Sequence, residues 1–264
     1  MSSTRETIMV GDRRRSYLLV EPRTPRESAP LIVALHGRTQ NARVMRSFSG
    51  RTLDALADRL GAPLVYLNGH GRAWNDGRRR AVSAAQKRNV DDVGFVRAVV
   101  ARHGRPTIAV GYSNGGQLVH RLLREAHGLL DGAVVIAAGL PVDADYSLSE
   151  LAPDRVPVLL LHGTADPVVP YAGGPTRLLG RPLGSVLSAR ETAERYATGG
   201  APRVTADGDI ERVDWGTVRL VTQFGVGHVI PNRVTAPRFV GPSHADLDAG
   251  EEIEEFLAAR VRRS

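Results

Sequence analysis

The sequence of 264 residues contains no cysteine. This absence excludes disulfide bridges, thiolate metal ligands and a cysteine nucleophile. Lysine is nearly absent too, because Lys87 is the only one and the other 34 of the 35 basic residues are arginines. The arginines are spread among 28 acidic residues, a pattern that points to codon usage rather than to a phosphate-binding surface. We therefore expect no nucleic-acid binding, although Arg13–Arg15 and Arg78–Arg80 are two short basic clusters.

Long hydrophobic runs are also missing. No apolar run approaches the roughly 20 residues that a membrane-spanning helix needs, and Met1–Glu6 has none of the apolar character of a secretory signal. These absences predict a cytoplasmic protein that does not associate with membranes. We find no repeat and no break in composition, so we expect a single domain over residues 1–264.

The N-terminal region predicts an antiparallel hairpin. Thr7–Val10 and Ser16–Val20 are short and strand-like, and Gly11-Asp12 supplies the residues that favour a tight turn. After it, Leu31–Leu35 is an uninterrupted apolar run, as expected for a strand that is covered on both faces.

From that run onward, apolar strands alternate with helical segments. Because parallel neighbours need a crossover connection, this alternation predicts an α/β fold with a mostly parallel, doubly wound sheet. Segment Pro167–Gly184, rich in glycine and proline, is interpreted as a linker. The predicted strands are Leu31–Leu35, Pro63–Leu67, Pro106–Val110, Gly132–Ala137, Val156–Leu161 and Thr217–Thr222, and the predicted helices are Arg51–Leu60, the segment around Phe95–Val100, Asn114–His127, Ser188–Ala197 and Asp246–Val261.

Ser113 is the candidate nucleophile. It lies in Gly111–Gly115, which fits the pattern G-x-S-x-G, and it follows a predicted strand and precedes a predicted helix. In this context the pattern is typical of a strained turn that exposes the serine, with small neighbours because larger side chains would collide with adjacent strands.

A serine hydroxyl needs a base to take its proton and an acid to orient that base. For this kind of turn the expected chain order is serine, acid, histidine. Asp166 follows the strand Val156–Leu161, and His228 follows the last predicted strand. We therefore predict Ser113, Asp166 and His228 as the catalytic residues.

Other histidines and acids remain as alternatives. His244 is a second candidate base, whereas His36 and His162 end strands and are interpreted as hydrogen-bonded structural residues. The alternative acids are Asp143 and Asp145, which follow the strand Gly132–Ala137; Asp91 and Asp92 are interpreted as a helix cap.

Acyl transfer also needs donors for an oxyanion. The main-chain N–H of Asn114, directly after the candidate nucleophile, is one expected donor. The second should come from the loop after Leu31–Leu35, where the main-chain N–H of Arg38 is our choice and that of Thr39 the fallback.

Six segments follow one another along the chain in a characteristic order: His36-Gly37-x-Thr39-Gln40, Trp74-Asn75, Asp91–Phe95, Gly111–Gly116, His162-Gly163-x-x-Asp166 and Gly227-His228. Together they resemble the poly(3-hydroxybutyrate) depolymerase and feruloyl esterase-like group of α/β-hydrolases. The resemblance implies an α/β-hydrolase fold and ester hydrolysis by Ser113, Asp166 and His228, with Trp74 and Thr39 near the substrate.

The chain departs from the secreted, polymer-degrading members of that group. It lacks cysteines, we expect no signal peptide, and position 38, often cysteine there, is Arg38. We therefore expect a small soluble ester or short oligomer as substrate, without a cofactor or metal. Arg38 and Arg78–Arg80 suggest an acyl group that carries a carboxylate. Alternative functions are another serine hydrolase, such as a peptidase or a dienelactone hydrolase-like enzyme, and a non-catalytic binding protein on the same fold.

Overall fold

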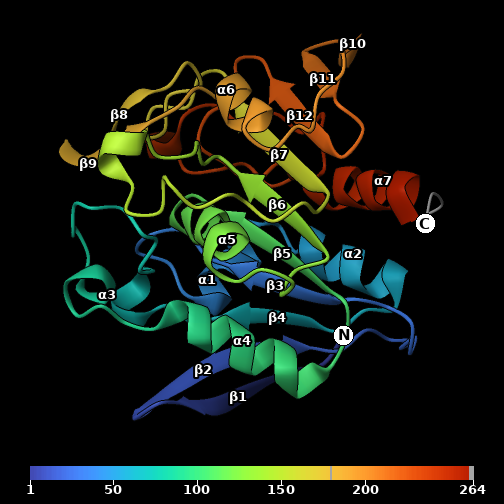
Figure 1. Ribbon diagram of the computed structural model, residues 1–264. Helices are drawn as coiled ribbons and strands as arrows, with labels where there is room; N and C mark the ends of the chain where they lie inside the picture. Colours follow the sequence, from blue (N-terminus) through green and yellow to red (C-terminus); the bar gives the residue numbers. More distant parts are fainter. Residues whose placement is uncertain (179, 262–264) are drawn as a thin grey trace.

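The computed structural model describes residues 1–178 and 180–261. A ten-stranded sheet crosses the molecule in the order β1-β2-β4-β3-β5-β6-β7-β12-β11-β10 (Figure 1). The six strands from β4 to β12 in this order run parallel to one another, which confirms the predicted α/β fold with a mostly parallel sheet. They are β4 (Leu64–Leu67), β3 (Leu31–Leu35), β5 (Thr107–Tyr112), β6 (Gly132–Ile136), β7 (Val158–Gly163) and β12 (Val218–Gln223).

An antiparallel hairpin lies at each edge of the sheet. The predicted N-terminal hairpin is present as β1 (Ser3–Val10) and β2 (Arg13–Val20). At the other edge, β10 (Arg203–Asp207) and β11 (Ile210–Asp214) form a hairpin that the sequence did not predict. Every residue of β10 is exposed, so this strand lacks the apolar alternation that identifies a half-buried strand.

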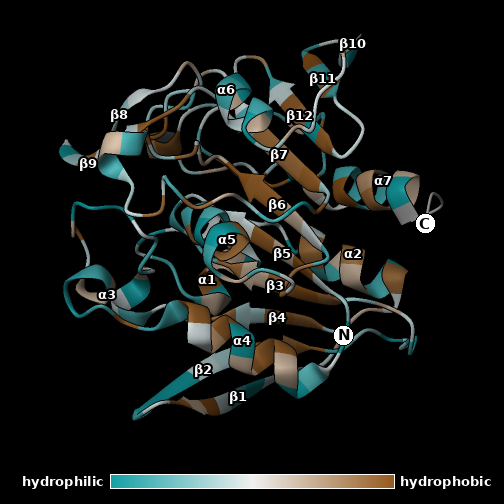
Figure 2. Cartoon of the chain, in the orientation of Figure 1, coloured by the Kyte–Doolittle hydropathy of each residue, from teal (hydrophilic) through white to brown (hydrophobic). Residues whose placement is uncertain are grey.

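Helices cover both faces of the sheet. Helices α4 (Asp92–His103), α5 (Asn114–Glu125) and α6 (Ala189–Glu194) pack on one face. Helices α1 (Ala42–Phe48), α2 (Thr52–Leu60) and α7 (Ala249–Val261) pack on the other. Figure 2 shows the central strands as largely hydrophobic and the outer helices as mixed in hydropathy, as burial on two faces requires.

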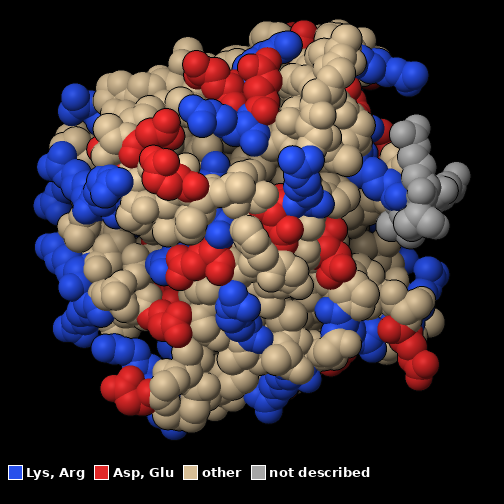
Figure 3. Space-filling model, viewed as in Figure 1, with Lys and Arg blue, Asp and Glu red and all other residues tan. Residues whose placement is uncertain are grey.

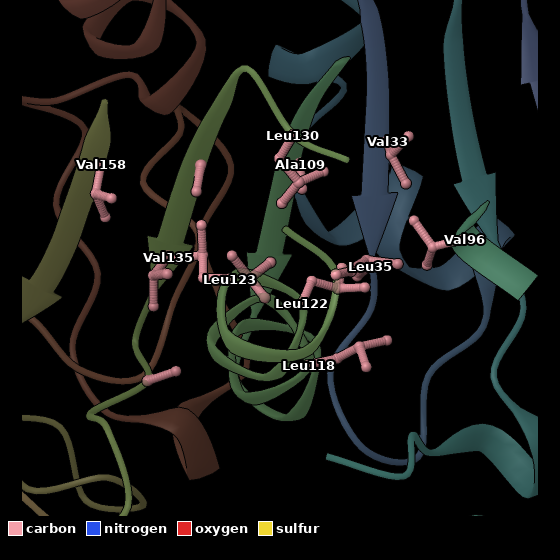
Figure 4. Packing of buried hydrophobic residues seen from close by; sticks show 14 of the residues in the cluster. Val33, Leu35, Val96, Ala109, Leu118, Leu122, Leu123, Leu130, Val135 and Val158 are labelled. Atoms are coloured by element: carbon pink, nitrogen blue, oxygen red, sulfur yellow. The ribbon is translucent and has the colours of Figure 1, made fainter. Parts of the chain in front are cut away.

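Helix α5 is held to the sheet by leucines on one side. Buried side chains at positions 118, 122 and 123 recur at helical spacing and gather against the central strands (Figure 4). The side chains that share this cluster with Leu118, Leu122 and Leu123 include Val33, Leu35, Ala109, Leu130, Val135 and Val158. This packing fixes the start of α5 at the end of β5.

The interpretation of Pro167–Gly184 as a linker was wrong. This region and the residues just beyond it contain β8 (Gly174–Leu178) and β9 (Arg181–Val186), which pair in a separate two-stranded sheet. Two glycines with positive φ and a register shift at Thr176/Arg177 break the alternation along these strands. Leu179, within the same segment, lies outside the described residues.

The polar stretch between Gly69 and Asn89 contains a short 3₁₀ helix, η1 (His70–Arg72), and helix α3 (Ala84–Lys87). A reciprocal capping box between Ser83 and Gln86 begins α3. The other short 3₁₀ helices are η2 (Asp143–Asp145) and η3 (Arg238–Val240). Over the described ranges, no helix is long and apolar enough to cross a membrane.

Candidate active site

Ser113 occupies a strained turn between β5 and α5. Its backbone has φ 52° and ψ −117°, a conformation that non-glycine residues rarely adopt, and its main-chain N–H donates to the carbonyl of Ile136 at 2.9 Å. The flanking glycines are required sterically. A Cβ at Gly115 would collide with the carbonyl oxygen of Leu35, and one at Gly111 with the backbone of Gly115. The predicted role of the small neighbours is therefore visible in the packing.

The structure brings the three predicted catalytic side chains together. Nε2 of His228 lies 2.9 Å from Oγ of Ser113, and Nδ1 of the same ring lies 2.7 Å from Oδ2 of Asp166. Because the carboxylate accepts the proton at Nδ1, the unprotonated Nε2 faces the serine hydroxyl. Ser113 follows β5, Asp166 follows β7 and His228 follows β12. These strands are distant in sequence but end at the same side of the sheet.

Neighbouring residues fix the histidine in this orientation. The main-chain N–H of His228 donates to the carbonyl of Val240 at 2.6 Å, and the Tyr112 hydroxyl donates to the His228 carbonyl at 2.8 Å. The Tyr112 ring also packs on the imidazole, with 5.1 Å between the ring centroids. The base is therefore held from its backbone and from one ring face.

Asp166 is buried and remains an anion. Its Oδ1 accepts main-chain N–H groups from Val168 and Val169, each at 2.8 Å. Burial alone would raise the pKa of this carboxyl, but the charge of His228 and hydrogen bonds from His162 and His228 outweigh it and lower the pKa. Asp166 can therefore orient and stabilise an imidazolium near neutral pH.

The alternative bases have other roles in the structure. His36 is fully buried; its Nδ1 donates to the Gly37 carbonyl at 2.7 Å, and its Nε2 accepts from the Gly69 N–H at 2.9 Å. His162 donates from Nε2 to the Val169 carbonyl at 2.9 Å and lies 3.3 Å from Oδ2 of Asp166. Both are hydrogen-bonded structural histidines, as predicted. His244 is exposed and 4.0 Å from Asp246.

The alternative acids also lie outside the hydrogen-bonded chain. Asp143 is exposed, and Asp145 accepts the main-chain N–H of Ser185 at 2.6 Å. Asp91 caps α4 as predicted, since its side chain accepts the Gly94 N–H at 2.6 Å. The interpretation of Asp92 as a second cap was wrong, because its carboxylate is buried and paired with Arg15 at 2.6 Å.

A cavity of about 250 Å³ opens above Ser113. Its polar wall comes from the loop after β3 and the start of α5, and its apolar wall from α1, the β8–β9 hairpin and the loop before α7. The lining residues are Gly37, Arg38, Thr39, Gln40, Val44, Phe48, Arg78, Tyr112, Ser113, Asn114, Gln117, Val168, Val169, Thr176, Leu178, Leu183, His228, Pro237, Phe239 and Val240.

The two predicted oxyanion donors both line this cavity. The main-chain N–H of Asn114 belongs to the first turn of α5, where helix geometry leaves N–H groups without intrahelical partners. The Arg38 N–H makes no hydrogen bond within residues 1–178 and 180–261. Thr39 does not serve as the fallback, because its own N–H already donates to the Arg72 carbonyl at 2.8 Å.

Trp74 lies elsewhere than the resemblance implied. Its side chain is fully buried and is absent from the described lining of the cavity. The indole Nε1 donates to the His36 carbonyl at 2.7 Å, and the Trp74 main-chain N–H donates to Oδ1 of Asn114 at 2.8 Å. Trp74 thus packs behind the residues that line the cavity. Thr39, by contrast, does line the cavity.

Asp76 is a residue of the site that sequence reasoning did not single out. It is fully buried, and its Oδ2 accepts Nδ2 of Asn114 at 2.6 Å and Nη2 of Arg78 at 2.6 Å, while its Oδ1 accepts Nε2 of Gln86 at 2.7 Å. Burial raises the pKa of Asp76, but the Arg78 charge and hydrogen bonds outweigh it, so the pKa is lowered. The sequence signal for Asp76 was its place two residues after Trp74 in a polar loop.

The chain has the fold of the α/β-hydrolase class, with Ser113, Asp166 and His228 at one end of its parallel strands. Solved structures support this class: an acetyl xylan esterase from Aspergillus awamori has a TM-score of 0.64 at 14% identity, covering 97% of this chain and 99% of that one. Est1E from Butyrivibrio proteoclasticus has a TM-score of 0.58 at 13% identity, covering 98% and 99%. At these identities the similarity shows the fold alone.

Sequence comparison gives the family. The chain is 32% identical over 292 aligned positions to "Putative esterase NocK" of Nocardia uniformis subsp. tsuyamanensis, covering 97% of this chain and 82% of that protein. It belongs to this esterase family. No protein-family model matches the chain.

Proposed function

We propose that this protein is a serine esterase that hydrolyses carboxylic esters through an acyl-serine intermediate. The observation that carries the proposal is the unbroken hydrogen-bonded chain from Ser113 through His228 to Asp166. Three loops that are far apart in sequence supply these side chains, and the serine lines a cavity. Membership of an esterase family agrees with this chemistry.

In the first step, Oγ of Ser113 attacks the ester carbonyl carbon while Nε2 of His228 takes the hydroxyl proton. The carbonyl oxygen becomes an oxyanion that accepts from the N–H groups of Arg38 and Asn114, each worth on the order of 3 kcal/mol. Asp166 stabilises the imidazolium. As the carbon–oxygen bond breaks, His228 returns the proton to the departing alcohol.

In the second step, water attacks the acyl-serine. His228 takes a proton from this water, and the second oxyanion uses the same two donors. Collapse of that intermediate releases the carboxylic acid, and the proton on His228 returns to Oγ of Ser113. Only the chain's own residues and water take part in this proposed cycle.

The volume of the cavity supports a small substrate. At about 250 Å³ it is smaller than the roughly 300–1,000 Å³ typical of sites for drug-sized ligands. A short soluble ester, or the end of a short oligomer, fits this space better than a polymer strand. The resemblance to polyhydroxybutyrate depolymerases and feruloyl esterases thus extends, in our proposal, to the bond cleaved rather than to a polymeric substrate.

Two experiments test the proposal. Ser113→Ala should abolish hydrolysis of short p-nitrophenyl esters, and a fluorophosphonate probe should label the wild-type protein but not this variant. Retained turnover in Ser113→Ala would falsify the assignment of the nucleophile. An unlabelled, inactive wild-type protein would instead favour a non-catalytic binding protein, and preferential cleavage of amides over esters would favour a peptidase.

A further inference from the structure

The side chain of Arg38 is a partly buried cation that makes no hydrogen bond within the described residues. Its Nε and Nη2 atoms are buried and make no hydrogen bond within the described residues. Burying a charged group without a partner is costly, so polar groups in this state are uncommon and call for an explanation. Burial accordingly lowers the pKa of Arg38, and the neighbouring Arg78 charge lowers it further.

The carboxylate near Arg38 is already used. Asp76 accepts three hydrogen bonds from Arg78 and one each from Gln86 and Asn114. The charges of Arg78 and Asp76 neutralise each other. The net charge of this wall of the cavity is therefore the positive charge of Arg38. The Nε and Nη2 donors of its guanidinium are therefore not satisfied by the described residues of the protein itself.

The position of Arg38 relates this charge to the reacting carbonyl. Its main-chain N–H is a proposed oxyanion donor, so the side chain starts beside the carbonyl oxygen of the bound ester, and the same residue lines the cavity over Ser113. A negative group on the acyl chain, a few bonds from the carbonyl, lies within reach of such a side chain. A guanidinium is well suited to a carboxylate because it donates two parallel hydrogen bonds.

The surroundings of the cavity are basic as well. Lys and Arg side chains gather along the left side of the molecule in Figure 3, on the side where β8, β9 and α3 lie in Figure 1. Exposed basic residues of these segments include Arg79, Arg80, Arg177 and Arg181. A surface of one charge sign favours approach of an oppositely charged substrate.

We propose that the enzyme prefers esters whose acyl group carries a carboxylate, and that Arg38 binds this carboxylate. This inference rests on the proposed esterase function and narrows its substrate class. Half-esters of short dicarboxylic acids are the simplest substrates of this kind. The guanidinium of Arg38 then selects for the acyl carboxylate, while its main-chain N–H donates a hydrogen bond to the oxyanion.

The test compares two substrates that differ only in charge: the mono-p-nitrophenyl ester of glutaric acid and the p-nitrophenyl ester of its monoamide. The wild-type protein should show a kcat/KM about tenfold or more higher for the anionic ester, as expected for a charge-assisted pair in a desolvated site. Arg38→Gln should bring the ratio of the two kcat/KM values close to one. The ratio is formed within one variant, so a change in the oxyanion site, which affects both esters alike, cancels from it.

A matched control is Arg155→Gln, which removes the same charge from an exposed position before β7 at the opposite ends of the strands. It should keep the wild-type ratio. Equal or better hydrolysis of the neutral ester by the wild-type protein would overturn the proposal, and so would an unchanged ratio in Arg38→Gln. A preference for a carboxylate on the alcohol rather than on the acyl group would also count against it.

A binding measurement separates failure of this inference from failure of the esterase proposal. In Ser113→Ala, calorimetry should show tighter binding of monomethyl glutarate than of methyl glutaramate, and Arg38→Gln in that background should remove the difference. This result would support the carboxylate site even if the protein hydrolysed neither ester. Equal binding of the two ligands would reject the site, whatever fluorophosphonate labelling showed about Ser113.

Discussion

Asp76 and Asn114, 38 residues apart in the chain, are joined by a hydrogen bond of 2.6 Å from the Asn114 amide to the buried carboxylate. The bond connects the loop that carries Arg78 to the first turn of α5. In that turn, the main-chain N–H of Asn114 is a proposed oxyanion donor. Asp76 thus holds two residues that line the cavity, Asn114 and Arg78, but does not itself line it.

We predict that Asp76→Asn destabilises the protein and slows turnover. Removing the charge leaves Arg78 buried and uncompensated, and breaking such a pair costs about 3–5 kcal/mol in the free energy of unfolding. Displacement of Asn114 should lower kcat with little change in KM, because an oxyanion donor acts mainly in the transition state. Urea unfolding and steady-state ester hydrolysis measure the two effects.

The control for this variant is Asp143→Asn. Asp143 is exposed, and its pair with Arg195 is 3.7 Å long, so the change should cost less than about 1 kcal/mol and leave kcat unchanged. If Asp76→Asn behaved like this control, the network around Asn114 would have no positioning role.

A second prediction concerns the close contact between α5 and β3. A Cβ on Gly115 would strike the Leu35 carbonyl, which is backbone and cannot rotate away. Gly115→Ala should therefore destabilise the protein by about 3 kcal/mol or more, since the helix and the strand must separate. Ester hydrolysis should fall as well, because Asn114 moves with the helix. Thermal unfolding and activity assays measure both.

The comparison variant is Gly104→Ala at the end of α4. Gly104 has φ 60°, but a Cβ there meets no atom within 4 Å, so only the backbone preference is lost, at about 1 kcal/mol. Similar losses in the two variants would mean that the contact between Gly115 and Leu35 relaxes without cost.

The third prediction is a loss of stability in acid. Burial lowers the pKa of His36 from 6.5 to about 4 and that of His120 to about 3. Below pH 6.5 the unfolded chain binds protons at these histidines while the folded protein does not. The free energy of unfolding should therefore decrease as the pH falls from 6.5 toward 4, by about 3 kcal/mol for His36.

Urea midpoints measured between pH 4.5 and 7 test this dependence. His36→Gln should show a shallower decrease than the wild-type protein, whereas His244→Gln, which changes an exposed ring, should retain the wild-type slope. Parallel curves for wild type and His36→Gln would rule out His36 as a source of the pH dependence.

The sequence predicted the central strands and the order of Ser113, Asp166 and His228 because both depend on local patterns. A fully buried strand reads as a continuous apolar run, and each of the three residues follows such a run. The β8–β9 and β10–β11 hairpins are mostly exposed or rich in glycine, so neither produces a periodic signal.

The contacts of the site could not be read in the same way. Asp92 has the residue type and position of a helix cap, yet its partner Arg15 lies 77 residues away. Asp76 reaches Asn114 across 38 residues, and Trp74 is directed into the protein by a hydrogen bond from its indole Nε1 to the His36 carbonyl. Such pairings depend on which strand ends become neighbours in the folded sheet. The order of the strands determines this, and local sequence patterns do not reveal that order.

The hairpins at the two edges of the sheet lead to a prediction about where the backbone opens most readily. Ser113, Asp166, His228 and Arg38 follow strands that are hydrogen-bonded to a neighbour on each side, whereas β1 and β10 each have a free edge. Local opening begins where the backbone is exposed and pairing is one-sided. The edge hairpins should therefore exchange their amide hydrogens many times faster than β3, β5 and β7, and fraying there should leave the cavity intact.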